Sequence, residues 1–202
     1  MTLWLAPAPL VLASRSAARR ALLEAAGVPI ELCPADLDER ALEATASTQE
    51  PAAIAALLAR EKASFAAKGH PGRLVLGADQ TLALGTKRFS KPADRLAARA
   101  QLKALRGRTH ELHAAVALVQ DGAVVFECVE TARLTMRSFS DAFLDRYLET
   151  LGAGALTSVG GYQLEGLGIQ LFEHIDGDYF TILGLPLLRA LDFLRQRGCL
   201  AR

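Results

Sequence analysis

Apolar residues along the chain form short continuous runs that alternate with segments in which they recur every three or four positions. Continuous runs of this length are typical of buried strands, and they lie at residues 9–13 and 74–78. Residues 30–33 are predicted to form another strand. The wider spacing predicts amphipathic helices, and it marks residues 17–26, 51–68 and 96–105. Strands that alternate with helices predict an α/β fold.

Local signals refine these segments. Ser16 is a suitable N-cap for the first of the predicted helices. Residues 35–40 are acidic and irregular, and they are predicted to form a loop. The buried strand at residues 74–78 ends on a carboxylate, Asp79, after which residues 81–84 continue extended.

The second half of the chain contains a clear hairpin signal. Asp121-Gly122 separates two long strand-like segments, residues 110–119 and 124–136. These strands are expected to pair antiparallel, which makes the predicted sheet mixed. A helix, a strand and a last helix are expected at residues 140–152, 169–175 and 187–194.

Composition limits the classes of protein that fit. With 202 residues, 51% of them hydrophobic, the chain can bury a sizeable core, and residues 1–202 are predicted to form a single domain with room for two lobes. A formal net charge of +1 gives no overall attraction to nucleic acid or to an anionic membrane. The three cysteines lack a C-x-x-C spacing, which argues against a disulfide framework and favours buried thiols in a reducing cytosol.

The apolar start of the chain raises the question of a signal peptide. It has no basic stretch and contains Pro7 and Pro9, so a buried first strand is the better interpretation. No later run approaches the roughly 18 uninterrupted apolar residues of a membrane-spanning helix. We therefore expect a soluble, cytoplasmic protein with no membrane partner.

Common catalytic motifs do not occur in the sequence. It has no P-loop, dinucleotide-binding, nucleophile-elbow or zincin motif, and His110-Glu111-Leu112-His113 has the wrong spacing for two ligands on one helical face. A mechanism that depends on histidine is therefore disfavoured. The near-neutral charge and the lack of a basic, aromatic-rich face also disfavour a nucleic-acid-binding module.

Polar residues follow two of the predicted strands, in the region where open α/β sheets bind ligands. After the first strand, Ser14, Ser16 and either Arg19 or Arg20 could hold a phosphate with the free N-H groups of the helix start. Taken alone, a serine-rich helix start is more often only a cap.

Asp79 follows the third strand, where a lone carboxylate often only caps a turn. That interpretation leaves Glu39, Lys62 and Lys91 unrelated to it. A phosphoryl-transfer site accounts for all four residues, because it needs cations for phosphate oxygens, carboxylates for a divalent metal, and one carboxylate that deprotonates water.

These residues also resemble a known family. Residues 12–23, LASRSAARRALL, are similar to the opening signature L-A-S-x-S-P-x-R-R-x-L-L of the Maf nucleotide pyrophosphatases. Further matches follow in collinear order over nearly the whole chain: Asp38-Glu39, Glu61-Lys62-Ala63, Gly77-Ala78-Asp79-Gln80, Lys91-Pro92, Gly107-Arg108-Thr109-His110, Glu165-Gly166-Leu167-Gly168 and Gly184-Leu185-Pro186-Leu187.

The resemblance implies hydrolysis of a nucleoside triphosphate between the α and β phosphates, which releases the monophosphate and pyrophosphate. Asp79 would be the catalytic proton acceptor, and with Glu39 it would bind a divalent cation, Mg²⁺ or Mn²⁺. The substrate would be held by Ser14, Ser16, Arg19, Lys62 and Lys91. The implied fold is an elongated, two-lobed α/β fold of the Maf/ITPase-like type, with a central mixed sheet flanked by helices and the site between the lobes. A homodimer is expected from the resemblance alone.

Within this family, three positions differ between members that act on nucleotides with different bases. Members of the family that act on 7-methyl-GTP tend to have Asp-Gln and Glu-Gly where pyrimidine-type members have Asp-Thr and Gln-Gly, and this chain has Gln80 and Glu165. A carboxylate suits the N-H edge of guanine, because uracil presents one N-H between two carbonyls. Ala18 stands where the two groups have tryptophan or arginine, and it matches neither.

The sequence therefore favours a 7-methyl-GTP-like substrate. The alternatives are a dTTP- or UTP-type pyrophosphatase of the same family and a non-catalytic inhibitor of septum formation. The presence of Asp79, Lys62 and Lys91 argues against the non-catalytic role.

Overall fold

The computed structural model describes residues 2–202, which divide into two compact units. The first unit contains the described residues as far as Gln80, together with His113–Glu130 and Tyr179–Arg202. The second unit contains Thr81–Leu112 and Thr131–Asp178. No helix among the described residues is long and apolar enough to cross a membrane.

A mixed sheet runs through the fold, as the sequence predicts. Its strand order is β2-β1-β3-β5-β6-β7, and β4 pairs with β3. β1 is parallel to both β2 and β3, whereas β3 with β4 and β6 with β7 are antiparallel. The strands are β1 (Leu10–Leu12), β2 (Ile30–Leu32), β3 (Val75–Leu84), β4 (Lys87–Phe89), β5 (Thr109–Gln120), β6 (Ala123–Met136) and β7 (Phe172–Asp176).

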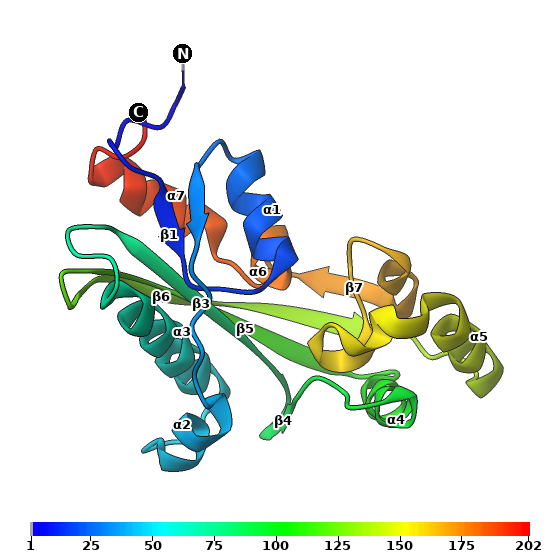
Figure 1. Ribbon diagram of the computed structural model, residues 1–202. Coiled ribbons are helices and arrows are strands. Elements are labelled where there is room, and N and C mark those ends of the chain that lie inside the picture. Colours follow the sequence, from blue (N-terminus) through cyan, green and yellow to red (C-terminus); the bar gives the residue numbers. More distant parts are fainter. Residues whose placement is uncertain (1) are drawn as a thin grey trace. The chain divides into compact units, whose positions relative to one another are not determined.

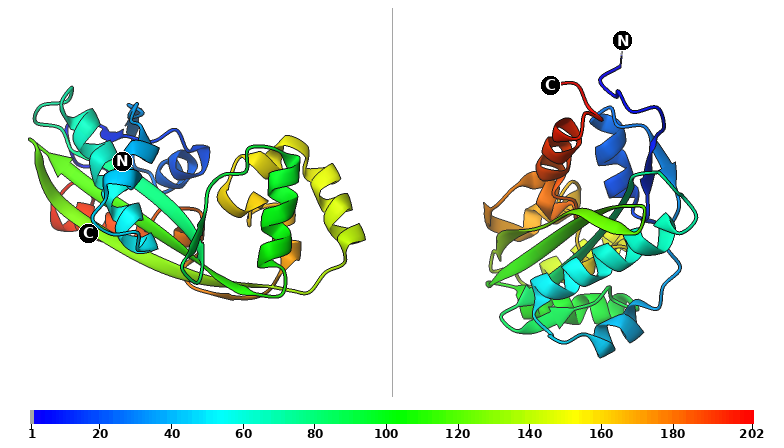
Figure 2. Two further views of the ribbon diagram at one scale, coloured as in Figure 1. Left: turned by 90° about the horizontal axis from the view of Figure 1, so that it is seen from below. Right: turned by 90° about the vertical axis from the view of Figure 1, so that its left-hand side faces the viewer.

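In the first unit, helices cover both faces of the sheet. The helices α1 (Ala17–Ala25) and α7 (Leu187–Gln196) lie on one face, and α3 (Pro51–Ala67) lies on the other (Figure 1 and the right-hand view of Figure 2). Leu76 and Ala78 pack in the core under α1 and α7, whereas Val75 packs against α3. Because side chains alternate along a strand, Asp79 faces α3 as Val75 does.

Gly77 lets β3 approach the main chain of α3 closely. A Cβ atom at this position would lie 2.1 Å from the carbonyl oxygen of Ala59 and 2.6 Å from the nitrogen of Ala63. The helix therefore packs directly on the strand, with small side chains between them. This close packing brings Lys62 of α3 to the level of Asp79, two residues along β3.

The second unit contains α4 (Arg95–Leu105) and α5 (Asp141–Leu151), which a group of surface charges connects. Asp141 accepts hydrogen bonds from Arg99, Lys103 and Arg106 at 3.3, 3.0 and 2.7 Å. These donors hold the pKa of Asp141 well below its usual range, with Arg106 as the largest contribution. Ser140 caps α5, the helix that the sequence predicts from residue 140, by accepting from the nitrogen of Phe143.

His110 is fully buried in the second unit. Its Nε2 atom lies 2.7 Å from the hydroxyl of Tyr162, and its Nδ1 atom has no hydrogen-bond partner among the described residues. Burial lowers the pKa of His110 from 6.5 to about 4. The folded protein therefore favours the neutral ring, and the stability that this provides is complete above pH 6.5 and is lost as the pH falls towards 4.

We expect His110→Gln to remove this part of the acid sensitivity. A pKa difference of this size corresponds to at most about 3 kcal/mol between the two pH limits. The free energy of unfolding, measured by urea titration at pH 7 and pH 4, should fall less for the variant than for the wild type. His174→Gln, at an exposed position of the same unit, is the control and should leave the pH dependence as it is. If His110→Gln and the wild type had the same pH dependence of stability, His110 would not contribute to the acid sensitivity.

The structure corrects three local expectations. Part of the predicted loop at residues 35–40 is helical, because Asp38 caps α2 (Glu39–Thr45) by accepting from the nitrogen of Ala41. β3 runs unbroken through Asp79, so this carboxylate lies within the strand rather than after its end. The strand expected from residue 169 begins at residue 172, after the 3-10 helix Leu167–Leu171. Further short helices not foreseen are Gly152–Leu156, Val159–Gly161 and α6 (Tyr179–Ile182).

Candidate functional site

Two carboxylates and one ammonium group meet in the first unit. Lys62 Nζ lies 2.6 Å from Asp79 Oδ1 and 2.9 Å from Glu39 Oε1. The side chains of Lys62 and Asp79 are only 11% and 13% exposed, whereas that of Glu39 is 48% exposed. A strand, a long helix and the start of a short helix thus each supply one charged group to the same point.

Burial dominates the electrostatics of Asp79. Loss of solvent raises the pKa of this carboxyl, and the charges of Lys62 and Arg19 oppose the rise without cancelling it. The nearby charge of Glu39 raises the pKa of Asp79 further. Asp79 is therefore a stronger proton acceptor than an exposed aspartate.

Arg19 is held by main-chain oxygens. Its Nε atom donates to the carbonyl of Gly184 at 2.7 Å, and its Nη1 atom donates to the carbonyl of Ala78 at 2.8 Å and to Ser14 Oγ at 3.3 Å. Burial lowers the pKa of Arg19, against the opposing charges of Asp79 and Glu39. The Nη2 atom remains able to donate, because no described residue accepts from it. Arg19 thus presents a fixed positive group beside the residue that precedes Asp79.

The loop between β1 and α1 places two hydroxyl groups beside this arginine. Ser16 caps α1 by accepting from the nitrogen of Arg19, as the sequence predicts. Ser14 is buried, and its Oγ accepts from the nitrogen of Ser16 at 3.2 Å as well as from Arg19. Both hydroxyls accept from the protein and keep their own O-H groups for an anion. Ala18 is half-buried on α1.

Gln80, the next residue along β3, points to the opposite face of the strand from Asp79. Its Nε2 atom donates to the carbonyls of Thr181 and Ile182, each at 3.0 Å. The structure therefore ties Gln80 to the segment that also provides Gly184 to Arg19. Sequence reasoning missed this segment, because main-chain carbonyls carry no residue type; the only signal was the string Gly184-Leu185-Pro186-Leu187.

The structure brings together most of the residues named from the sequence. Those that meet in the first unit are Ser14, Ser16, Arg19, Glu39, Lys62, Asp79 and Gln80. Ala18 also belongs to the first unit, where it lies on α1, whereas Lys91 and Glu165 belong to the second unit. Lys91 is exposed in the loop between β4 and α4, and Glu165 is exposed in the turn before the 3-10 helix Leu167–Leu171.

The donor set at Asp79 fits a magnesium-type ion bound partly by substrate. No group of three or more histidine, cysteine or carboxylate side chains within residues 2–202 is placed to hold a metal alone. Asp79 and Glu39 nevertheless converge on one point, where they share Lys62. Mg²⁺ usually takes one or two protein carboxylates, and phosphate and water complete its coordination.

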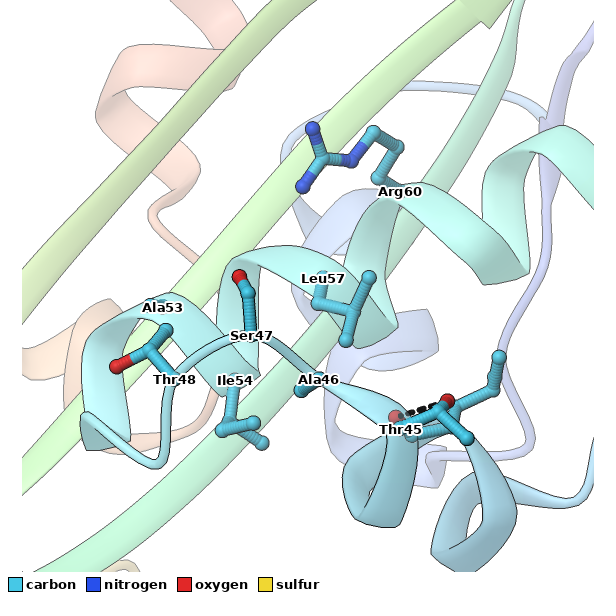
Figure 3. A pocket seen from close by; sticks show the side chains of 9 residues that line it. Thr45, Ala46, Ser47, Thr48, Ala53, Ile54, Leu57 and Arg60 are labelled. Atoms are coloured by element: carbon cyan, nitrogen blue, oxygen red, sulfur yellow. Dashed lines mark hydrogen bonds between the residues drawn. The ribbon is translucent and has the colours of Figure 1, made fainter.

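A separate pocket of about 410 Å³ lies beside α2 and the start of α3 (Figure 3). Leu42, Ile54 and Leu57 make part of its lining apolar, and Arg60 lies at its edge. None of the site residues named above lines it. The pocket is therefore distinct from the group around Asp79.

Comparison with known proteins places this chain among close relatives. A family model described as Maf-like protein matches residues 9–197. Proteins named nucleoside triphosphate pyrophosphatase are 59% identical in Rhodopseudomonas palustris (strain HaA2) and 54% identical in Bradyrhizobium diazoefficiens, each over 100% of both chains. Among solved structures, a HAM1 protein from Coxiella burnetii matches with a TM-score of 0.44 and 18% identity, covering 63% of this chain and 72% of that one.

Proposed function

The chain belongs to the Maf-like protein family, and from this premise we propose that it is a nucleoside triphosphate pyrophosphatase. In the proposed reaction, water cleaves the bond between the α and β phosphates, and the products are a nucleoside monophosphate and pyrophosphate. The observation that carries the proposal is the contact of buried Asp79 and Lys62 with the half-exposed Glu39, beside Arg19.

Asp79 is proposed to accept the proton of the attacking water. Its raised pKa supports this role, because a more basic carboxylate is a better general base near neutral pH. Lys62 holds Asp79 in place at 2.6 Å and contributes positive charge beside the substrate phosphates. Each proton taken from water is released to solvent after the products leave, so Asp79 returns to its starting state.

Binding of the triphosphate is assigned to cations and hydroxyls of this chain. Arg19 has its Nη2 donors available, and Ser14 and Ser16 have their O-H groups. Lys91 is proposed as a further phosphate ligand on the basis of the family resemblance. Asp79 and Glu39 would hold a divalent cation, Mg²⁺ or Mn²⁺, which when bound neutralises phosphate charge.

We propose a 7-methyl-GTP-like nucleotide as the substrate. Glu165 and Gln80 are the residues that support this choice, and an exposed carboxylate such as Glu165 is suited to the N-H edge of guanine. Ala18 supports neither base class. A pyrophosphatase for dTTP or UTP is the alternative within the same chemistry.

Glu165→Gln tests the choice of base. We expect kcat/KM for 7-methyl-GTP to fall about tenfold or more relative to that for UTP, because hydrogen bonds to a charged group contribute roughly 1.5 to 3 kcal/mol. Steady-state assays of pyrophosphate release with both nucleotides measure the ratio. Glu173→Gln, at an exposed position of the same unit, is the control. An unchanged ratio in Glu165→Gln would exclude this carboxylate as a reader of the base.

The proposed activity itself is tested with a nucleotide panel. The protein is incubated with Mg²⁺ or Mn²⁺ and 7-methyl-GTP, UTP, dTTP or dUTP, and pyrophosphate release is measured. We expect turnover of at least one of these nucleotides, and its dependence on either metal tests the cation proposal. A lack of turnover with the whole panel would favour a non-catalytic binding role.

A further inference from the structure

Both N-H groups of the Gln80 side-chain amide are used within the protein. Its nitrogen carries two hydrogens, and the carbonyls of Thr181 and Ile182 accept them at 3.0 Å each. The opposite orientation of the amide would place its oxygen against two carbonyl oxygens. The contacts therefore define which way the amide points, and its nitrogen has no hydrogen left to donate to a ligand.

Both acceptors are the last two residues of α6, and they belong to a tight turn, Thr181 to Gly184, in which the helix ends. The carbonyl of Thr181 also accepts from the nitrogen of Gly184 at 3.0 Å, which closes the turn. Gly184 has a φ of +90°, a conformation that favours glycine, and its carbonyl accepts from Arg19 Nε at 2.7 Å. Gln80 thus holds the first two residues of the turn Thr181 to Gly184, and Arg19 holds its last residue.

The position of Arg19 depends on this turn. A Cβ atom at Gly184 would lie 3.3 Å from Arg19 Nη2 and 3.5 Å from Gln80 Oε1, so the three groups are packed closely. The two Nη1 contacts are made to Ala78 and Ser14, and within residues 2–202 the carbonyl of Gly184 is the acceptor for Nε. A shift of the turn would therefore remove one of the three contacts that fix the guanidinium and the direction of Nη2.

We propose that Gln80 is a positioning residue, which fixes the Thr181–Gly184 turn and through it the phosphate-binding donor of Arg19. The kinetic consequence rests on the proposed function, whereas the structural consequence does not. This role acts through a phosphate ligand and therefore concerns every nucleotide, in addition to the support that Gln80 gives to the choice of base.

Hydrogen exchange of the Arg19 Nε-H group tests the structural part without any substrate. The ¹⁵N NMR signal is assigned by its loss in Arg19→Lys. In Gln80→Leu we expect this proton to exchange about tenfold faster or more than in the wild type, because the turn that accepts it is released. Gln120→Leu is the matched control, since Gln120 also donates to a main-chain carbonyl, that of Gly72, at 3.0 Å. Unchanged exchange in Gln80→Leu would overturn the proposal.

Gln80→Asn provides a second test, which decides the question if Gln80→Leu does not fold. It keeps an amide but is one methylene shorter, so it cannot reach both carbonyls. We expect faster exchange of the Arg19 Nε-H proton in this variant as well. Exchange as slow as in the wild type would contradict the proposal in the same way.

Kinetics then test the effect of Gln80 on phosphate binding. In Gln80→Leu we expect KM to rise about tenfold for every nucleotide that the wild type cleaves, with little change in kcat, because a phosphate contact is lost in ground and transition states alike. Combined with Arg19→Ala, Gln80→Leu should add nothing further, as expected for residues that act through one another. A KM that stays unchanged for these nucleotides, or additive effects in the double variant, would overturn the proposal. Absence of turnover in the wild type would instead contradict the proposed function and leave the exchange result to decide the role of Gln80.

Discussion

Asp79→Asn is expected to lower kcat for pyrophosphate release by about 10²- to 10⁴-fold, the usual contribution of a general base. Asparagine has the same shape but cannot accept a proton from water. Asp79 is buried and its pKa is raised, so the loss of its basicity removes the group that the surroundings have made most suitable for this step. The measurement is the steady-state rate at saturating nucleotide and metal.

Asp192→Asn is the control for this substitution, since Asp192 is an exposed carboxylate of the first unit. It should retain the wild-type rate. The wild-type enzyme should also lose activity on the acid side as Asp79 is protonated, at a pH above the usual range for aspartate. Wild-type turnover by Asp79→Asn would show that another group activates water.

Gly77→Ala is expected to destabilise the protein by about 3 kcal/mol or more, at the upper end of the range for overpacking. The added Cβ would lie 2.1 Å from the carbonyl oxygen of Ala59, and main-chain atoms cannot move aside as a flexible side chain can. Either β3 or α3 must shift, which would also separate Asp79 from Lys62. Urea denaturation followed by circular dichroism gives the change in the free energy of unfolding.

A nearby glycine supplies the matched control for this prediction. Gly69 follows α3, and a Cβ there would meet only the carbonyl oxygen of Ala66, at 3.8 Å. Gly69→Ala should therefore change stability by less than about 1 kcal/mol. If Gly77→Ala were as stable as Gly69→Ala, the close contact between β3 and α3 would not contribute to the free energy of unfolding in the way that we propose.

Local patterns predicted much of the fold because they depend on neighbouring residues. The cap at Ser16, the helix from Pro51 and the turn at Asp121-Gly122 all follow from such patterns, and the structure confirms them. α2 was missed because it has no buried residue and therefore no apolar periodicity, and the acidic run around its cap, Asp38, is also typical of loops.

The candidate site shows a similar division. The sequence indicated that Glu39, Lys62 and Asp79 belong to one chemistry, since their residue types fit phosphoryl transfer. It did not indicate that Arg19 is anchored to the carbonyls of Ala78 and Gly184, which are 59 and 165 residues away along the chain. Such contacts depend on the tertiary packing of main-chain atoms, which leaves no pattern in residue types.

The products formed from one nucleotide test the central claim most directly. The wild-type protein is incubated with Mg²⁺ and the nucleotide of the panel that it cleaves fastest, and the products are separated by chromatography. We predict nucleoside monophosphate and pyrophosphate in equal amounts, with neither product formed at a comparable rate by Asp79→Asn. Nucleoside diphosphate with orthophosphate, or equal product formation by Asp79→Asn, would contradict α–β hydrolysis that depends on Asp79.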